Sequence, residues 1–291
     1  MELHIWGSDR KDPVSFTPEC VAAVWLVELL GVKVVRVVAS SNPNISPSGV
    51  LPALRDSDSG QVYGGFLSIW RYLKSIGYNV DSDCGQTPAQ CAESTALLAY
   101  LDSTLGIVSS YLLYLHKNNY ENYTRPLFTK LVPFPMQYSM PWAQYELVSR
   151  RCSDLAPSNT KAGQKELEID SPLVRKMQEE QKEKRSNLES AKENIKLLNY
   201  ASQVLDKLQS KLTPNLVGAN LCTADVLLLA HLHLYMSPQL PDRSIKSVVE
   251  QFPKLVEYYG QGVKKVNAVD VKIEQPTGRD VPSLANAILN W

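Results

Sequence analysis

The chain opens with apolar and polar blocks that predict a strand, a helix and a second strand. Residues 3–6 are a short apolar run typical of a strand, and the valine-rich run at 32–38 is typical of a buried parallel strand. Between them, residues 17–19 supply a cap, a proline and an acid, as at a helix start. Gly31 is the residue type that ends a helix in the left-handed conformation. This β-α-β order predicts two parallel strands joined by a right-handed crossover.

A polar loop at residues 40–48 precedes an expected β-hairpin and a helix. Residues 49–54 predict a strand whose Pro52 marks its start or an edge, because proline donates no ladder hydrogen bond. A turn leads to a second strand at 61–63. Four apolar residues then repeat at helical spacing over 66–76: Phe66, Ile69, Trp70 and Leu73. The first eighty residues therefore predict two parallel strands, a hairpin and two helices.

Beyond residue 81 the pattern is helical. Residues 90–115 carry apolar side chains in helical register: Leu97, Leu98, Leu101, Leu105, Val108 and Leu112. Prolines between 124 and 142 predict short helical pieces with aromatic side chains packed against the domain. Residues 224–235 and 252–259 predict two further helices. We therefore expect a thioredoxin-like domain at residues 1–80 and an all-α domain at residues 88–291.

A polar segment and a long helix lie inside the second domain. Residues 153–168 contain few large apolar side chains, so we expect a mobile surface loop whose removal leaves the fold intact. Residues 175–187 are charged all round and predict a solvated helical extension. An apolar stripe then predicts a buried face that ends before Pro214: Leu188, Ala191, Ile195, Leu198, Leu205, Leu208 and Leu212.

Composition narrows the class of protein. The 291 residues have 44% apolar content and zero formal net charge, which is typical of a globular chain and not of a nucleic-acid binder. The five cysteines are scattered without a CxxC pair, as in a reducing compartment. The start has a strand pattern and an acidic Glu2 in place of a targeting peptide, and no apolar run reaches the roughly 18 residues of a membrane span. We expect no membrane crossing within this chain; the residues after Trp291 would decide whether an anchor follows.

Three motifs resemble the glutathione-transferase superfamily. GVLPAL at 49–54 resembles the stretch that carries a cis-proline ahead of the third strand, and IWRYL at 69–73 resembles the I-x-x-Y-L of the third helix. CTAD at 222–225 resembles the capping box that starts the central helix of the α domain, with Cys222 in place of the hydroxyl. The resemblance implies an α+β, glutathione-transferase-like fold with a thioredoxin-like domain followed by an all-α domain.

Further segments resemble the metaxin family over residues 1 to about 260. TRPLF at 124–128 with LVPFP at 131–135 resembles the T-R-P…P-F-P segment of metaxins. MELHIW at 1–6 resembles the start of metaxins. Four later segments resemble their C-terminal core: PNLVG at 214–218, TAD at 223–225, AHL at 230–232 and FPKLV at 252–256. The proline segment points to the branch that includes the fungal metaxin-like peripheral subunit of the mitochondrial sorting and assembly machinery, the SAM complex.

The metaxin resemblance implies a non-enzymatic subunit that aids the insertion, folding and release of β-barrel precursor proteins and stabilises the complex. It implies a position at the cytosolic face of the mitochondrial outer membrane, against the membrane surface. The implied partners are the β-barrel core subunit, a second metaxin-like subunit and the precursors, with no nucleic acid. Which surfaces make these contacts, and what residues 175–187 do, stays open.

The resemblance also indicates that glutathione chemistry has been lost. Alignment through 69–73 places Gly65 and Phe66 where a transferase holds the glutamyl end of glutathione with an acid or amide and a serine. Losing several polar contacts of about 0.5–1.5 kcal/mol each leaves little affinity. Ser8 and Cys20 are the candidate nucleophiles, Cys20 because a helix N-terminus lowers the pKa of a thiol. A buried apolar thiol is the interpretation we favour for Cys20.

Other polar residues have structural interpretations. His231 and His233 are two residues apart, so they lie on different helix faces and do not suit a shared metal ion. Asp225 is expected to be a helix cap and not a catalytic acid. The aromatic residues from Tyr111 to Trp142 predict a packing surface, with an interaction surface or a ligand cleft as alternatives. We therefore predict no catalytic, cofactor-binding or metal-ligating residues, and no cofactor.

Two other functions remain in view. A glutathione-dependent transferase with an atypical site would be retained on immobilised glutathione. A soluble adaptor of the same fold, for example in a translation complex, would localise to the cytosol. A fold does not carry its chemistry with it, so neither function follows from the fold alone.

Overall fold

The computed structural model describes residues 1–7, 14–32, 35–83, 85–152, 172–266 and 271–283, and in the helix that begins at Pro172 it describes side chains from residue 188 onward. The predicted loop at 153–168 therefore lies outside the described residues.

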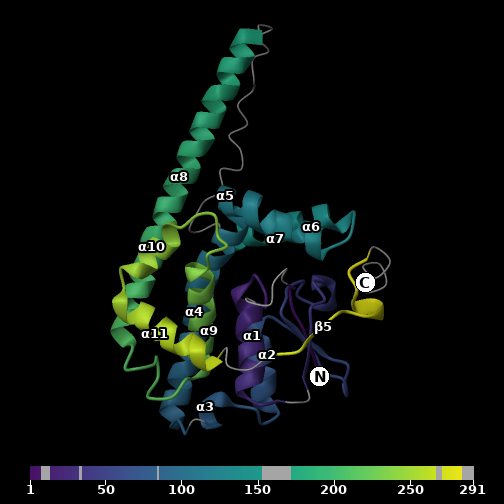
Figure 1. Ribbon diagram of the computed structural model, residues 1–291, viewed down its shortest axis with the longest axis vertical. Coiled ribbons are helices and arrows are strands. Elements are labelled where there is room, and N and C mark those ends of the chain that lie inside the picture. The colour runs from purple at the N-terminus through teal and green to yellow at the C-terminus, as the bar shows by residue number, and fades with distance from the viewer. Residues whose placement is uncertain (8–13, 33–34, 84, 153–171, 267–270, 284–291) are drawn as a thin grey trace.

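A five-stranded mixed sheet forms one side of the molecule (Figure 1). The strands, in the spatial order β4-β3-β1-β2-β5, are β4 (Val62–Gly64), β3 (Ala53–Arg55), β1 (Glu2–His4), β2 (Arg36–Val38) and β5 (Ile273–Glu274). β1 pairs in parallel with β2 and antiparallel with β3, so that Leu3 lies opposite both Val37 and Leu54. The predicted parallel pair and hairpin are both confirmed.

The helix between the parallel strands has the predicted ends. α1 (Pro18–Leu29) begins after Thr17, and Gly31 adopts a left-handed φ of 60°. Thr17 has the extended backbone of a cap residue, although its side chain accepts no hydrogen bond from the helix. α1 is buried along most of its length because α2 (Phe66–Ser75) and α9 (Thr223–Met236) both pack on it. The peptide bond before Pro52 is cis, as the motif predicts.

The rest of the described chain is mainly helical, and several of its helices pack on α9. The helices are α3 (Val80–Asp83), α4 (Pro88–Ser110) with a π-helical turn at Tyr111–Leu115, α5 (Lys117–Asn119) with a second π-helical turn at Tyr120–Thr124, α6 (Arg125–Leu131), α7 (Met136–Arg151), α8 (Pro172–Lys211), α10 (Ser244–Glu250) and α11 (Pro253–Val266). α9 packs against α1, α4, α10 and α11. All six apolar residues predicted to face the core from residues 90–115 are buried.

One helix in the described part of the chain has the length and hydropathy of a membrane span. It runs from Pro88 to Leu115 and contains an 18-residue window with a mean hydropathy of 1.4. Of the residues in that window, 61% are buried inside the protein, and α4 packs against α9. These contacts are those of a core helix.

The last strand corrects the expectation of an all-α second domain. Ile273 and Glu274 pair in parallel with Val37 and Val38, and the Ala39 N–H donates to the Glu274 carbonyl at 2.9 Å. The C-terminal segment therefore returns to the first sheet and extends its edge (Figure 1). Two paired residues are too short for a strand pattern in the sequence. We propose that the two domains divide near residues 80–88, with residues 271–283 belonging structurally to the first.

The proline-rich region is more helical than predicted, and its aromatic residues are less buried. The prolines do break the chain between α6 and α7, but Pro141 lies inside α7. Phe128 is buried, whereas Phe134, Tyr138 and Trp142 are 77%, 59% and 61% exposed. The expectation that these aromatic side chains pack against the domain is therefore wrong for α7, because α7 turns other residues inward: Met136, Met140, Pro141, Gln144 and Val148.

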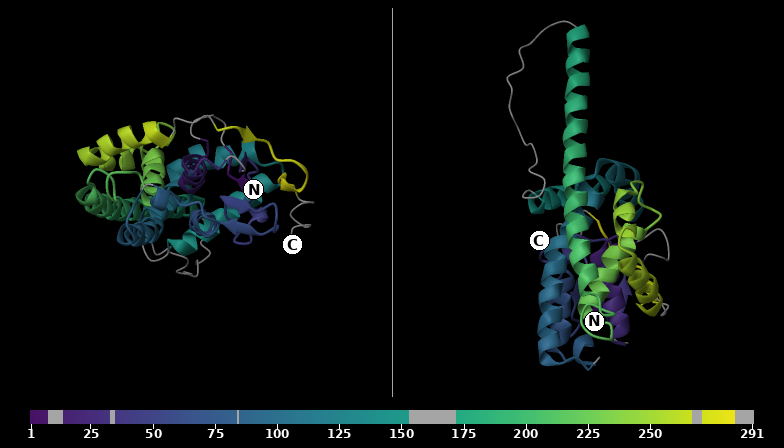
Figure 2. Two further views of the ribbon diagram at one scale, coloured as in Figure 1. Left: turned by 90° about the horizontal axis from the view of Figure 1, so that it is seen from below. Right: turned by 90° about the vertical axis from the view of Figure 1, so that its left-hand side faces the viewer.

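The apolar stripe predicted on α8 is also displaced. Leu205 and Leu208 are buried as predicted, but Leu188 and Ile195 are 58% and 59% exposed. The buried face instead begins at Leu197 and continues through Ala201 and Val204. Figure 2 shows that the N-terminal part of α8 projects beyond the rest of the described molecule. Farther along, Asn194 lies 3.0 Å from His116, so the exposure of Ile195 comes from the face of the helix that it occupies.

Candidate functional site

A cleft of about 450 Å³ lies between the sheet side of the molecule and the helices. One wall comes from the end of β1, the start of α1, residues 50–51 and the start of α2. The other comes from α4, its π-helical turn, α7 and α9. Most of the large side chains in both walls are apolar: Trp6, Leu51, Phe66, Leu113, Leu147 and Val148.

Gly65 and Phe66 lie in the wall of this cleft, where the resemblance places a glutathione site. Gly65 has a φ of 80°, a conformation that favours glycine, and its N–H donates to the Pro52 carbonyl at 2.8 Å. Phe66 is 3% exposed and belongs to the hydrophobic core. Neither side chain offers a hydrogen bond to the α-carboxylate or α-amine of a glutamyl group.

The thiol of Cys20 is buried and not activated. Burial raises its pKa to about 12, outweighing hydrogen bonds from Thr17 and Ser15 that lower it. A thiol with such a pKa stays protonated at neutral pH and is a weak nucleophile. The start of α1 therefore does not activate Cys20, and the packing interpretation is the better one. The other candidate nucleophile, Ser8, lies outside the described residues.

Three charged side chains from three helices meet in the cleft. The Arg151 guanidinium at the end of α7 lies 3.1 Å from the Asp102 carboxylate of α4 and 3.9 Å from the Glu19 carboxyl of α1. Arg151 also donates to the Asp102 carbonyl at 3.0 Å. Burial, with the nearby Asp102 carboxylate, raises the pKa of Glu19 to about 7, although Arg151 opposes the shift. Two carboxyl groups therefore share one guanidinium.

No pattern in the sequence brings these three residues together. Glu19 had a sufficient explanation as an acid in a first helical turn. Asp102 carried the available signal, since it lies inside the apolar register of α4 between Leu101 and Leu105. Its partners are distant in sequence, so the grouping depends on the packing of α1, α4 and α7 around the cleft.

The two histidines of α9 have separate partners. His231 is buried, with Nδ1 2.7 Å from the Ser109 hydroxyl. The Ser109 hydroxyl donates to Tyr235, and Tyr235 donates to the Leu105 carbonyl, so His231 carries its proton on Nδ1. Burial lowers the pKa of His231 to about 3, so the ring is neutral. His233 instead lies 3.1 Å from the Tyr259 hydroxyl, which confirms that the two rings occupy different faces.

Asp225 is the cap that the motif predicts. Its carboxylate accepts from the Leu216 and Cys222 N–H groups, both at 2.9 Å, and from the Tyr258 hydroxyl at 2.6 Å. Asp81 adds a cap from α3 by accepting from the Thr223 N–H at 2.8 Å. All of the carboxylate bonds of Asp225 stabilise the entry to α9, so this acid has a structural role.

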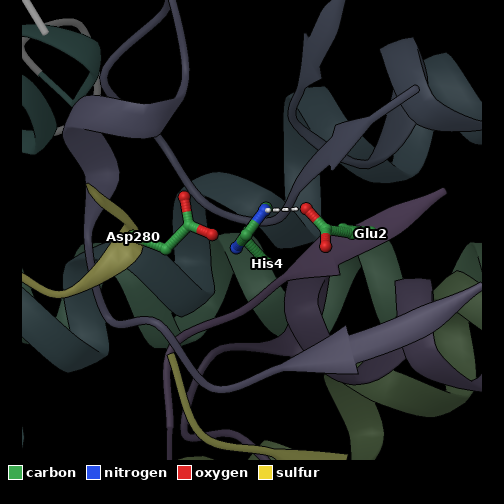
Figure 3. Close-up of side chains that lie close together, drawn as sticks. All are labelled: Glu2, His4 and Asp280. Carbon is green, nitrogen blue, oxygen red and sulfur yellow. Dashed lines mark ion pairs between the residues drawn. The ribbon is translucent and has the colours of Figure 1, made fainter. Parts of the chain in front are cut away.

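A second charged cluster joins β1 to the C-terminal segment. Figure 3 shows the His4 imidazole between the carboxylates of Glu2 and Asp280. His4 is fully buried, its Nε2 lies 3.9 Å from Glu2, and burial lowers its pKa to about 4. Asp280 makes a bidentate pair with Arg55 at 2.6 and 3.2 Å, and Glu2 pairs with Arg36 and Arg55. Because the arginines already occupy both carboxylates, the cluster is better explained as a fastening of the C-terminal segment than as a metal centre.

Two models of one protein family match the chain. The Tom37 model, described as an outer mitochondrial membrane transport complex protein, matches residues 20–145. The Tom37 C-terminal domain model matches residues 153–291. Together they cover the chain except for its first nineteen residues and the stretch 146–152.

The chain is also similar to metaxins. It is 29% identical to metaxin-1 of Mus musculus over 168 residues, which are 58% of this chain and 51% of that protein. It is 30% identical to metaxin-1 of Bos taurus over 171 residues, 57% of this chain and 52% of that protein. The Drosophila melanogaster metaxin-1 homolog is 31% identical over 123 residues, 42% of this chain and 36% of that protein. The chain thus spans about half the length, or less, of these relatives.

Two solved structures are similar to this one. A glutathione S-transferase of Ceriporiopsis subvermispora, in complex with glutathione, is 13% identical, with a TM-score of 0.49 over 92% of this chain and 96% of that chain. A glutathione transferase of Phanerochaete chrysosporium is 14% identical, with a TM-score of 0.44 over 87% and 96%. The α+β, glutathione-transferase-like fold rests instead on the strand order, the cis-proline before β3 and the capped central helix. With family models matching most of its length, the chain belongs to the Tom37/metaxin family.

Proposed function

We propose that this chain is a non-enzymatic subunit of the mitochondrial SAM complex, where it aids the insertion, folding and release of β-barrel precursors and stabilises the complex. The observation that carries the proposal is the match to the two Tom37-family models. The chain spans about half of its metaxin-1 relatives, so their partners come to it only as part of the proposal.

The chemistry of the cleft supports a role without glutathione turnover. Gly65 and Phe66 provide no side-chain partner for the glutamyl end, and Cys20 is a protonated core thiol. Glutathione carries a net negative charge at neutral pH, whereas the cleft presents Glu19 and Asp102. Arg151, the one lysine or arginine among the described lining residues, is already shared between those two carboxyl groups.

The proposal includes a location and two protein partners. The chain would lie at the cytosolic face of the outer membrane, in contact with the β-barrel core subunit and a second metaxin-like subunit. The family description of an outer membrane transport complex protein supports membership in such an assembly.

Purification from mitochondria tests this proposal. A tagged chain is isolated from detergent-solubilised mitochondria, and protease is added to intact mitochondria in parallel. We expect the β-barrel core subunit and the second metaxin-like subunit to co-purify, and the tag to be digested from the cytosolic side. Isolation of the chain alone would contradict the proposal, and a purely cytosolic fraction would favour the adaptor function.

Glutathione binding tests the transferase alternative. We expect no retention on immobilised glutathione and no turnover of a generic electrophile, with an active glutathione transferase as the positive control. We also expect Gly65→Glu combined with Phe66→Ser to create no activity, because the buried thiol and the excess of carboxyl groups in the cleft remain. Turnover by the unaltered chain would restore the transferase function.

A further inference from the structure

The described residues that line the cleft include one more carboxyl group than guanidinium groups. The side chains of Glu19, Asp102 and Arg151 are 25%, 34% and 34% exposed, so a ligand in the cleft can reach them. Arg151 contacts both acids. When both acids are ionised, the trio therefore carries one net negative charge.

In the part of the chain that the structure describes, neighbouring groups do not cancel this charge. The other titratable groups near Glu19 are Cys20 on α1, Tyr114 in the π-helical turn after α4, and His231 on α9, beside Arg151. Burial raises the pKa of both Cys20 and Tyr114, and lowers that of His231, so all three groups are neutral at pH 7. Among the described lining residues, the charge of the cleft is thus set by Glu19, Asp102 and Arg151.

Several side-chain donors in the cleft wall are already used within the protein. The Gln144 amide donates to the Gly49 carbonyl at 3.3 Å, and the Ser110 hydroxyl donates to the Gly106 carbonyl at 2.7 Å. The Ser109 hydroxyl donates to Tyr235, and Arg151 donates to Asp102. Carboxyl oxygens are therefore better represented than free donors, which favours a ligand that donates hydrogen bonds.

The rest of the wall is apolar and suits a hydrophobic body. Phe66, Leu113, Leu147 and Val148 line the cleft together with Trp6. A cavity of about 450 Å³ with apolar walls and a few converging polar groups has the size and character of a small-ligand site.

We propose that this cleft binds a ligand that carries a protonated amine on an apolar body, with the Glu19 carboxylate as its counterion and Asp102 beside it. The amine belongs either to a free amphiphile or to the lysine side chain of a peptide. This site goes beyond the proposed assembly function and does not depend on it.

The state of Glu19 gives the site a characteristic pH dependence. The pKa of Glu19 is about 7, so at pH 6 Glu19 is protonated in most protein molecules and must release its proton before it pairs with an ammonium group. An alkylammonium group keeps its own proton across this range. Affinity should therefore increase about tenfold between pH 6 and pH 8 and then level off, as linkage requires.

Isothermal titration calorimetry of the 291-residue chain with hexylammonium tests the proposal. Hexanol and hexanoate are the uncharged and anionic controls of matched length. We expect hexylammonium to bind more tightly than either control, and more tightly at pH 8 than at pH 6. Glu19→Gln should weaken binding at least tenfold at pH 8 and remove the pH dependence. Glu250→Gln changes an exposed acid on α10 and should bind as the unaltered chain does.

A second arm separates the two sources of the amine. Acetyl-Leu-Lys-Leu-amide is compared with the same peptide carrying norleucine in place of lysine. Tighter binding of the lysine peptide than of hexylammonium assigns the site to a peptide, and the reverse assigns it to a free amine.

Three results would overturn the site. These are no binding of hexylammonium or the lysine peptide, equal or tighter binding of hexanol or hexanoate, and unchanged affinity in a folded Glu19→Gln protein. Circular dichroism checks the fold of each variant. If Glu19→Gln does not fold, Asp102→Asn replaces it, and unchanged affinity and pH dependence in that variant would equally contradict the proposal.

Discussion

The Glu19 carboxyl makes the stability of the protein depend on pH. Its pKa is raised to about 7 in the folded chain and lies near 4.5 without the fold. The folded protein therefore holds a proton that the unfolded chain has lost between these values, so this contribution to stability falls as pH rises from about 4.5 and is gone above about 7.

Replacing Glu19 by glutamine should remove this dependence. The difference in the free energy of unfolding between Glu19→Gln and the unaltered chain should shift by about 1–3 kcal/mol in favour of the variant as pH rises from 4.5 to 8. Urea unfolding at both pH values measures the difference. Parallel pH profiles for the two proteins would show that Glu19 is not titrating near neutrality.

The structural role of Asp225, a fully buried acid, can be tested by substitution. Asp225→Ala removes the acceptor for two buried N–H groups and the Tyr258 hydroxyl, so we expect a loss of about 3–5 kcal/mol in the free energy of unfolding. Asp206→Ala, at an exposed position of α8, is the matched control and should change it by less than about 0.5 kcal/mol. If Asp225→Ala lowers the free energy of unfolding in urea no more than the control does, Asp225 does not act as a stabilising helix cap.

Residue roles that depend on local motifs can be predicted from the sequence, and those that depend on distant partners cannot. The CTAD box predicts Asp225 as a cap of α9 because one of its donors, the Cys222 N–H, is only three residues away. Glu19 has no such local partner. Its charge depends on Asp102 and Arg151, whose approach requires three helices to be in place.

At the scale of elements, the aromatic residues of α6 and of the turn before α7 differ in burial. We expect Phe128→Ala to lower the free energy of unfolding by about 3–5 kcal/mol, because Phe128 is fully buried against Trp6 and Phe16. Phe134→Ala should change it by less than about 0.5 kcal/mol, since that ring is 77% exposed. Urea unfolding of the two variants measures these changes. Comparable losses in the free energy of unfolding would mean that Phe134 is packed in solution.

The sequence predicts which segments are helical better than which faces are buried. The apolar register of residues 90–115 identified six core residues correctly, because α4 and its π-helical turn lie between neighbours along most of their length. In α8 the apolar stripe did not predict the exposure of Leu188 and Ile195, because burial there depends on which neighbours reach each face of the helix. Pro141 likewise does not end α7, although it removes one helical hydrogen bond.

At the scale of the whole molecule, the C-terminal segment closes the structure on its own first strands. Asp280 pairs with Arg55, and the Glu274 carbonyl accepts from the Ala39 N–H. We expect Asp280→Ala to speed native-state hydrogen exchange of the Ala39 amide about tenfold, corresponding to about 1–2 kcal/mol. The Ile5 amide, which bonds to Val38 within the sheet, should be unaffected. Equal acceleration at both amides would indicate a general loss of stability and contradict a local fastening.

The strand order β4-β3-β1-β2 was within reach of the sequence, and the addition of β5 was not. The first four strands follow from one crossover and one hairpin, which are short-range rules. β5 contributes two residues, and its pairing with β2 depends on contacts made more than 230 positions away. The cleft could be placed by the superfamily resemblance, but its charge could not.

The most direct test of the proposed function is the assembly of β-barrel precursors in isolated mitochondria depleted of this chain. Radiolabelled β-barrel precursors are followed by native electrophoresis, and a precursor destined for the matrix serves as the control. We expect β-barrel assembly to stall, the control import to continue, and the unaltered chain, when added back, to restore assembly. Normal β-barrel assembly in depleted mitochondria would contradict the account.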